Sequence, residues 1–295
     1  MSMTATTFQA GDTISGELFL LINPQLGTSR GGSPYLRCQL GNRSGKAAGR
    51  CWSFDAARLR TVEDSPIIRI DGEVVDWQGK AQVNIESIEP VDADRETIAS
   101  LLPMTTGDIP TMFRSVRSLL ESIKDPTLAA LGEAFLDDEP LMEQFCDAPA
   151  GVSMHHACIG GLLEHTRSVM ELADAIADRY DGSPTPLNRD LLLMGAFVHD
   201  LGKTVELDWS RGFTYTDDGN LIGHIVRGAM MIEEKAADAS MAAAEIDDNT
   251  IRLLQHLVLS HHERPEYGAA RKPATPEAHA LALIDRLDAT LNLNK

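Results

Sequence analysis

Over the first 90 residues, hydrophobic positions fall in short stretches that partly alternate with polar ones. Five of these stretches are rich in β-branched or aromatic side chains, which is typical of strands. They are residues 18–22, 35–40, 49–54, 67–75 and 81–89. Turn-forming pairs separate them at Asn23-Pro24, Gly31-Gly32, Gly41-Asn42 and Gln78-Gly79. Five strands in so short a segment predict a small closed barrel rather than a sandwich, and the OB-fold is a good candidate.

The pattern changes near Pro90, after which apolar residues recur at helical spacing. The expected helices are residues 112–124, 127–136, 139–146, 153–180, 187–200, 222–239, 247–261 and 275–291. One interruption lies at 213–221, where Asp218-Gly219 predicts a hairpin turn. The sequence therefore predicts a multidomain β plus all-α protein, with a five-stranded OB-type barrel followed by a helical bundle.

A length of 295 residues also suggests two domains. We expect a barrel at 1–90, a linker at 91–111 and a helical domain at 112–295. No apolar run approaches about 18 residues, so no membrane span is expected, and the N-terminus lacks the pattern of a secretory signal. The four cysteines form no CxxC pair, which favours reduced thiols in a cytoplasmic protein.

Charge divides the chain in the same way. Residues 1–90 hold 9 basic and 10 acidic residues, whereas residues 91–295 hold 17 basic and 34 acidic residues and all nine histidines. Within 26–60 the balance reverses to a local net charge of +6. Because charge acts locally under screening, a basic patch on an acidic protein can still hold a polyanion.

Single-strand binding barrels combine a basic groove with aromatic stacking faces. The candidate nucleic-acid-binding residues are Arg30, Tyr35, Arg37, Arg43, Lys46, Arg50, Trp52, Arg58 and Trp77. An alternative stays open for Trp52 and Phe54, because alternate residues of one strand share a face and both would then belong to the barrel core. The basic residues would in that case form a solvated face.

The helical segment carries histidines and aspartates in apolar helical surroundings. They are His165, His199, Asp200, His224, His256, His261, His262 and Asp285. Buried imidazoles and carboxylates are costly unless they are paired or bind a metal, and helical bundles build dinuclear sites from such inward-facing groups. The absence of thiolates favours Mn, Fe, Co, Zn or Ni in a reactive site over a structural zinc.

The sharpest local motif is His199-Asp200-Leu201-Gly202-Lys203. His199 and Asp200 would close a helix that Gly202 stops. An aspartate there can bridge two metal ions with its two oxygens. Lys203, on a free turn, could reach a substrate phosphate.

These motifs resemble the HD-domain metal-dependent phosphohydrolase superfamily, and within it the YhaM-type 3′-to-5′ exoribonucleases. The resemblance covers nearly the whole chain and rests on MHH (154–156), EHT (164–166), HDLGK (199–203), GNLIGH (219–224), LQHLVLSHH (254–262) and IDRLDA (284–289). It implies one metal on His165, His199, Asp200 and Asp285, and a second on Asp200, His224, His261 and His262. His256 and Asp288 would orient ligands from outside, and His155 and His156 would be substrate contacts or helix-start residues.

Two departures separate the chain from the cyclic-dinucleotide branch of HD enzymes. RPEYG follows His262-Glu263 instead of a Gly-Tyr-Pro turn, and Gly161 stands where a carboxylate would support a third metal. Both argue against cyclic-di-GMP as the substrate.

The resemblance implies a 3′-to-5′ exoribonuclease that hydrolyses single-stranded RNA, or also single-stranded DNA, to 5′-mononucleotides. Asp200 and Lys203 would be its catalytic residues, and two divalent ions its cofactors, with Mn²⁺ favoured over Co²⁺, Fe²⁺, Ni²⁺, Mg²⁺ and Zn²⁺. One alternative is a phosphohydrolase of small nucleotides whose barrel regulates or oligomerises it. A second is an inactive nucleic-acid-binding protein. Metal identity, processivity and a homo-oligomeric state stay open.

Overall fold

The computed structural model describes residues 8–152, 156–210, 212–242 and 246–292. The chain forms two compact units. The first runs to Met104 and includes the short segment Trp209–Gly212, and the second comprises Thr105–Asp208 and Phe213–Lys295. No helix in the described part of the chain is long and apolar enough to cross a membrane.

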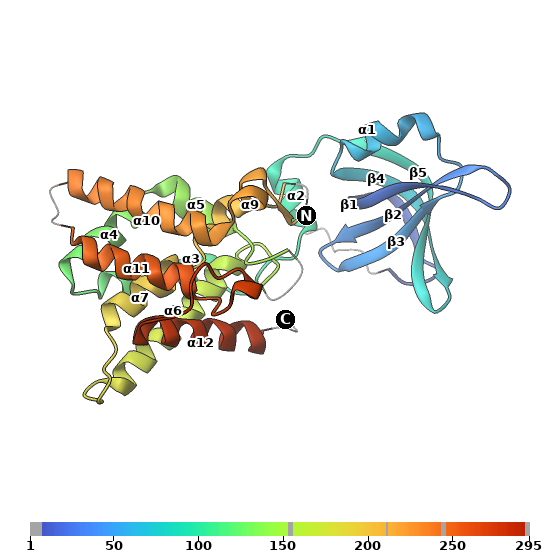
Figure 1. Ribbon diagram of the computed structural model, residues 1–295. Coiled ribbons are helices and arrows are strands. Elements are labelled where there is room, and N and C mark those ends of the chain that lie inside the picture. Colours follow the sequence, from blue (N-terminus) through green and yellow to red (C-terminus); the bar gives the residue numbers. More distant parts are fainter. Residues whose placement is uncertain (1–7, 153–155, 211, 243–245, 293–295) are drawn as a thin grey trace. The chain divides into compact units, whose positions relative to one another are not determined.

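The first unit is a five-stranded closed barrel, as predicted (Figure 1). Its strands are β1 (Thr13–Thr28), β2 (Pro34–Asn42), β3 (Gly45–Cys51), β4 (Ile67–Trp77) and β5 (Lys80–Val91). They follow the order β1-β2-β3-β5-β4, and only the β3–β5 pairing is parallel. Phe19, Leu36, Leu40 and Ile70 are fully buried inside it, because alternate strand residues face the interior. This mixed order is that of an OB-type barrel.

Two predicted turns of the barrel differ from the structure. Asn23-Pro24 does not end a strand; it lies inside β1, where the pairing with β2 shifts register between Ile22 and Gln25. At this bulge the ladder pairing is interrupted, so the strand tolerates a proline without an N–H to donate and a positive φ of 49° at Asn23. Gly41-Asn42 belongs to the end of β2, and the turn follows it at 43–44. Gly31-Gly32 and Gln78-Gly79 lie in turns, as predicted.

Short helical elements surround the barrel strands. A 3-10 turn, η1 (Ala56–Arg58), and helix α1 (Leu59–Glu63) connect β3 to β4. Helix α2 (Arg95–Leu101) follows β5, inside the segment predicted as a linker. The side chain of Asp94 caps α2 by accepting the amide hydrogen of Thr97. Ile98 and Leu101 are its buried residues.

The second unit is helical. Its longer helices are α3 (Ile109–Glu121), α4 (Pro126–Leu136), α5 (Glu139–Asp147), α6 (Gly161–Tyr180), α7 (Arg189–Val198), α10 (His224–Met241), α11 (Asp248–Ser260) and α12 (Pro276–Leu291). The side chains of Asp108, Asp125 and Asp138 cap α3, α4 and α5, each with a proline in the following turn. Helix α7 is central: every residue from Leu191 to Val198 is buried, and it packs against α6, α11 and α12. Figure 1 shows α10 and α11 running side by side.

Two predictions for this unit were wrong in detail. Helix α6 begins at Gly161 rather than residue 153, because Gly160 adopts a left-handed φ of 77°; residues 153–155 lie outside the described residues. Asp218-Gly219 is not a hairpin turn but part of the short helix α9 (Asp217–Leu221). The strands β6 (Leu207–Asp208) and β7 (Thr214–Tyr215) pair upstream of it, and helix α8 (Lys203–Glu206) and the 3-10 turn η2 (Pro265–Tyr267) complete the unit.

Candidate metal centre

Side chains from five helices converge inside the second unit. His165 lies on α6, His199 and Asp200 follow α7, His224 begins α10, His261 and His262 follow α11, and Asp285 lies on α12. His165, His199, Asp200 and His261 are all buried. Helix ends bring five of these seven residues together, because a helix terminus can place adjacent side chains at one point.

The first group of donor atoms surrounds the Nε2 atom of His165. This atom lies 3.2 Å from Nε2 of His199, 3.2 Å from Oδ1 of Asp285 and 3.6 Å from Oδ2 of Asp200. Two ligand atoms about 2.1 Å from one ion lie roughly 3.0 to 3.4 Å apart for octahedral and tetrahedral angles. The distances from His165 to His199 and to Asp285 fall in this range, and these three residues offer donor atoms that could hold one ion. Asp200 lies slightly farther from His165, at the edge of the same group.

The second group gathers at the other oxygen of Asp200. Oδ1 of Asp200 lies 3.5 Å from Nε2 of His224 and 3.6 Å from Nε2 of His261, and His262 offers a ring nitrogen to the same group. Those atoms of Asp200, His224 and His261 are buried without a hydrogen-bond partner among the described residues. Buried polar atoms are costly when unpaired, so the donor set fits a cation held between them.

Each imidazole is fixed through its other nitrogen. Nδ1 of His199 donates to the carbonyl oxygen of Ala196 at 2.8 Å, and Nδ1 of His261 donates to the carbonyl oxygen of Val258 at 2.7 Å. Nδ1 of His262 donates to the carbonyl oxygen of Tyr267 at 2.6 Å. Because a carbonyl can only accept, Nε2 of each ring carries the lone pair. This orientation is typical of metal-binding histidines.

Carboxylates fix the remaining two imidazoles. Nδ1 of His165 lies 2.7 Å from Oδ2 of Asp288, and Nδ1 of His224 lies 2.9 Å from Oε2 of Glu206. Asp288 thus has the geometry expected of an orienting residue. Glu206 was missed by the sequence analysis, because 18 residues separate it from His224 and it follows no recognisable motif.

The electrostatics of the centre keep His199, His262 and Asp200 in the form that binds a metal, whereas they favour the protonated form of His165. Burial lowers the pKa of His199 and of His262 to about 4, so both rings are neutral at pH 7. Burial alone would raise the pKa of Asp200, but the ammonium group of Lys203 holds it well below its usual value. Burial lowers the pKa of His165, but hydrogen bonds to Asp285 and Asp288 outweigh it and raise that pKa to about 9.

Lys203 is not on a free turn, contrary to the sequence prediction. It begins helix α8, and its Nζ donates to Oδ2 of Asp200 at 2.7 Å and to the carbonyl oxygen of Ala150 at 2.9 Å. The backbone hydrogen bond from Lys203 to Asp200 closes the turn at Gly202. Its ammonium group therefore lies beside the first group of donor atoms.

His256 lies apart from both groups of donor atoms. Its Nε2 accepts the backbone N–H of Ala274 at 3.0 Å, and His256 belongs to none of the metal-ligand groupings of the described residues. His156, left open by the sequence analysis, is buried in the loop before α6. His155 lies outside the described residues.

The barrel presents a separate candidate surface, which we call the aromatic platform: Tyr35, Arg50, Trp52 and Trp77. The Arg50 guanidinium lies 5.3 Å from the Trp52 ring centroid and 5.5 Å from that of Trp77, and the Tyr35 and Trp52 rings lie 5.0 Å apart. Trp52 is 43% exposed and Trp77 is 49% exposed, whereas Phe54 is buried. The core alternative therefore holds for Phe54 and is wrong for Trp52.

The other basic candidates of the barrel flank this platform in sequence. Arg30, Arg43 and Lys46 are exposed. Arg37 is exposed and hydrogen-bonds to Gln25, and one guanidinium nitrogen of Arg58 donates to the carbonyl oxygen of Ile88 at 3.0 Å. The cationic side chains are thus available at the surface rather than buried in ion pairs.

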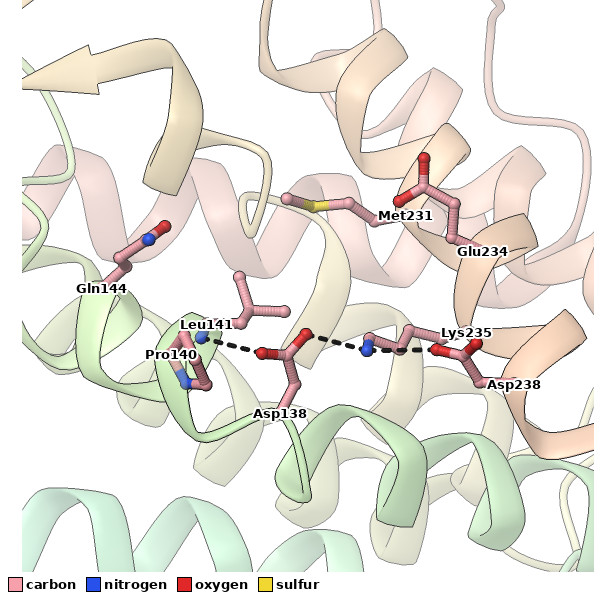
Figure 2. Close-up of a pocket in the computed structure, with 8 residues that line it drawn as sticks. All are labelled: Asp138, Pro140, Leu141, Gln144, Met231, Glu234, Lys235 and Asp238. Atoms are coloured by element: carbon pink, nitrogen blue, oxygen red, sulfur yellow. Dashed lines mark hydrogen bonds and ion pairs between the residues drawn. The ribbon is translucent and has the colours of Figure 1, made fainter. Parts of the chain in front are cut away.

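A surface pocket between α5 and α10 contains none of the candidate residues (Figure 2). Lys235 crosses it and pairs with Asp138 at 2.8 Å and with Asp238 at 3.3 Å. Asp138 also caps α5 by accepting the amide hydrogen of Leu141. These contacts link the start of α5 to α10.

Known proteins resemble the chain over nearly its full length. The HD domain family model matches residues 162–290. The 3′-5′ exoribonuclease YhaM of Bacillus pumilus is 33% identical over 296 residues, covering 99% of this chain and 90% of that protein. The YhaM exoribonuclease of Listeria welshimeri is 32% identical, covering 97% and 88%. That of Bacillus subtilis is 33% identical, covering 93% and 85%.

Proposed function

The chain belongs to the YhaM family of 3′-5′ exoribonucleases, and on that premise we propose that it is a divalent-metal-dependent exoribonuclease. Its substrate is single-stranded RNA, which it hydrolyses from the 3′ end to 5′-mononucleotides. The observation that carries the proposal is Asp200, whose two oxygens face two separate sets of imidazole nitrogens. A carboxylate placed in this way would hold one ion with each oxygen, as suits a dinuclear phosphodiesterase site.

We propose that His165, His199, Asp200 and Asp285 hold one ion, and that Asp200, His224, His261 and His262 hold the other. Two divalent ions supply Lewis acidity toward a phosphodiester and a nucleophile at neutral pH. The oxygen and nitrogen donors without thiolate suit Mn²⁺, Fe²⁺, Co²⁺, Ni²⁺ or Zn²⁺, and of these we propose Mn²⁺. The neutral state of His199 and His262 and the charge of Asp200 leave these donors ready to bind without losing protons.

Three residues beside the proposed ligands have supporting roles. Lys203 brings a cation beside Asp200, where it stabilises negative charge that develops on the phosphate or on the leaving 3′ oxygen. Asp288 and Glu206 hold the rings of His165 and His224 so that their Nε2 atoms stay directed inward. Pre-set donors lower the reorganisation needed when the substrate arrives.

The barrel, residues 1–90, acts in this proposal as a handle for the strand. The exposed rings of Trp52 and Trp77 offer stacking faces that tolerate any base, and Arg50 lies between them. The exposed basic residues around them bind phosphates and make the affinity depend on salt. The strongly acidic helical domain, residues 112–295, would otherwise repel RNA at long range.

The test uses a 5′-labelled oligoribonucleotide and the purified full-length protein. After chelation and re-addition of Mn²⁺, we expect a labelled ladder that shortens from the 3′ end, and chromatography of the unlabelled products should give 5′-mononucleotides. A ladder that is unchanged by chelation would contradict metal dependence. Turnover of a small phosphodiester that matches or exceeds turnover of long strands would favour the small-nucleotide phosphohydrolase instead.

A further inference from the structure

A buried histidine outside the proposed ligand set lies next to the first group of donor atoms. His156 precedes α6 in a loop, and its side chain is only 3% exposed. It therefore cannot reach a substrate. Its Nε2 atom lies 3.4 Å from Oδ2 of Asp288, and its Nδ1 atom lies 3.5 Å from Oε2 of Glu164. One imidazole thus stands between two carboxylates.

Asp288 connects this imidazole to the centre. The oxygen that faces His156 is the same Oδ2 atom that lies 2.7 Å from Nδ1 of His165. A separation of 2.7 Å is that of a strong hydrogen bond and is shorter than the spacing of two ligands on one ion. The cluster of His156, His165 and Asp288 is therefore an orienting chain and not a third metal site.

The backbone of His156 reaches a second element of the centre. Its carbonyl oxygen accepts the N–H of Ala150 at 3.1 Å, and the carbonyl oxygen of Ala150 accepts a hydrogen bond from Lys203 Nζ at 2.9 Å. The same residue is thus connected to the ring of His165 through its side chain and to the ammonium group of Lys203 through its main chain.

The loop holds His156 in an uncommon conformation. Its φ is 52°, in the left-handed region that residues other than glycine rarely adopt. Gly161 makes this possible, because a Cβ atom at that position would lie 2.0 Å from the His156 carbonyl oxygen. Buried residues keep such conformations only where the surrounding contacts impose them, and they concentrate at functional sites.

We propose that His156 is a positioning residue, which sets the orientation of His165 through Asp288 and the position of Lys203 through Ala150. This inference rests on the proposed metal centre. The side chain of His156 lies 3.4 Å from the Oδ2 atom of Asp288 that also contacts His165, while Ser168 and Asn292 donate to Oδ1 of Asp288 at 2.5 and 3.1 Å. Loss of the imidazole frees Oδ2 and loosens the ring of His165.

Two variants separate the imidazole from the backbone conformation. His156→Gly removes the ring, and glycine adopts a positive φ freely. His156→Asn keeps a short polar side chain that also tolerates this region. Gln78→Gly is the matched control, because Gln78 has a φ of 56° in an exposed turn of the barrel.

The full-length proteins are stripped of metal and titrated with Mn²⁺ by calorimetry, and their Co²⁺ forms are compared by absorption spectroscopy. We expect His156→Gly to weaken one of two binding events about 10- to 100-fold and to shift the Co²⁺ bands. His156→Asn should lie between this variant and the wild type, and Gln78→Gly should match the wild type.

Three outcomes would overturn the inference: wild-type affinities and spectra in both His156 variants, an equal loss of both ions, or unfolding of both metal-free variants. Unfolding of both variants would show that the imidazole of His156 only stabilises the fold. A wild-type protein that binds no divalent ion would overturn the proposed function instead, so the two failures are distinguishable.

Discussion

Glu206 accepts two hydrogen bonds from His224. Its Oε2 atom lies 2.9 Å from the ring Nδ1 atom, and its Oε1 atom accepts the backbone N–H at 3.1 Å. This pair fixes both the position of the first residue of α10 and the direction of its imidazole. Burial would raise the pKa of Glu206, but the hydrogen bond with His224 outweighs it and keeps that pKa below the usual value.

We therefore expect Glu206→Ala to lower the affinity for one of two divalent ions about 10- to 100-fold. Glu206→Gln should lose less, because its amide oxygen can still accept from Nδ1. Calorimetric titration of the metal-free protein with Mn²⁺ measures both variants, and Glu121→Ala on an exposed face of α3 serves as the control. Unchanged affinity in Glu206→Ala would show that His224 needs no carboxylate to hold its ring.

Asp200 is the residue whose loss should affect both ions. We expect Asp200→Asn to reduce kcat by at least about a thousandfold, the magnitude typical of removing a central catalytic group. The amide cannot offer two anionic oxygens, and Lys203 loses its partner. Metal content per chain and single-turnover rates measure the effect. Asp248→Asn, in the exposed first turn of α11, is the control. Retention of both ions by Asp200→Asn would refute the bridging role.

The sequence singled out the histidines and aspartates that the structure brings together, because such residues stand out in apolar helices. Apart from Asp288, it did not indicate which groups hold the rings in place. Ala196, Val258 and Tyr267 act through backbone carbonyls, which carry no side-chain signal. The contacts of Glu206 with His224 and of His156 with Asp288 depend on how α8 and the loop before α6 fold.

In the barrel, too, some features could be predicted from the sequence and others could not. Alternating apolar residues predicted all five strands, since burial on one face imposes that pattern. The bulge at Asn23-Pro24 was not predictable, because Asn-Pro is equally typical of a turn. The exposure of Trp52 was likewise undetermined, since β3 ends at Cys51 and strand alternation no longer applies beyond it.

The aromatic platform gives a separate prediction about RNA binding. Trp52→Ala and Trp77→Ala should each weaken binding of single-stranded RNA by about 1 to 3 kcal/mol, the contribution of one stacked base. Fluorescence anisotropy with a labelled oligoribonucleotide and metal-free protein measures the affinity. Tyr180→Ala, an exposed aromatic at the end of α6, is the control. If Trp52→Ala and Trp77→Ala bound RNA as tightly as the control Tyr180→Ala, the aromatic platform would be a solvated surface with no part in RNA binding.

Stability should depend on the ion pair in the pocket of Figure 2. Asp138→Ala should lower the free energy of unfolding by about 1 kcal/mol, because α5 loses its N-cap. Asp138→Asn keeps the cap and loses only the charge. The contact with Lys235 lowers the pKa of Asp138, so the charge stabilises the fold above the unfolded pKa and stops doing so as pH falls through the folded pKa.

Urea unfolding at pH 7 and at acidic pH separates these contributions. The difference between wild type and Asp138→Asn should be present at pH 7 and should shrink as Asp138 becomes protonated. The exposed Asp181→Asn should show no such difference. If the difference in the free energy of unfolding between wild type and Asp138→Asn grew toward acidic pH, the ion pair of Asp138 with Lys235 could not be its source.

The last prediction concerns Lys203, whose ammonium group lies between Asp200 and the carbonyl oxygen of Ala150. Burial lowers its pKa, but Asp200 outweighs this effect and raises it, so the group is charged at neutral pH. Lys203→Ala should reduce the single-turnover rate about 100-fold or more while changing substrate affinity less, because the charge matters most where negative charge develops. Lys203→Arg should restore only part of the rate, since a planar guanidinium spreads its charge. Lys272→Ala, exposed on the loop before α12, is the control. If Lys203→Ala kept the wild-type single-turnover rate, Lys203 would be a partner that stabilises Asp200 before metal binds and would have no part in catalysis.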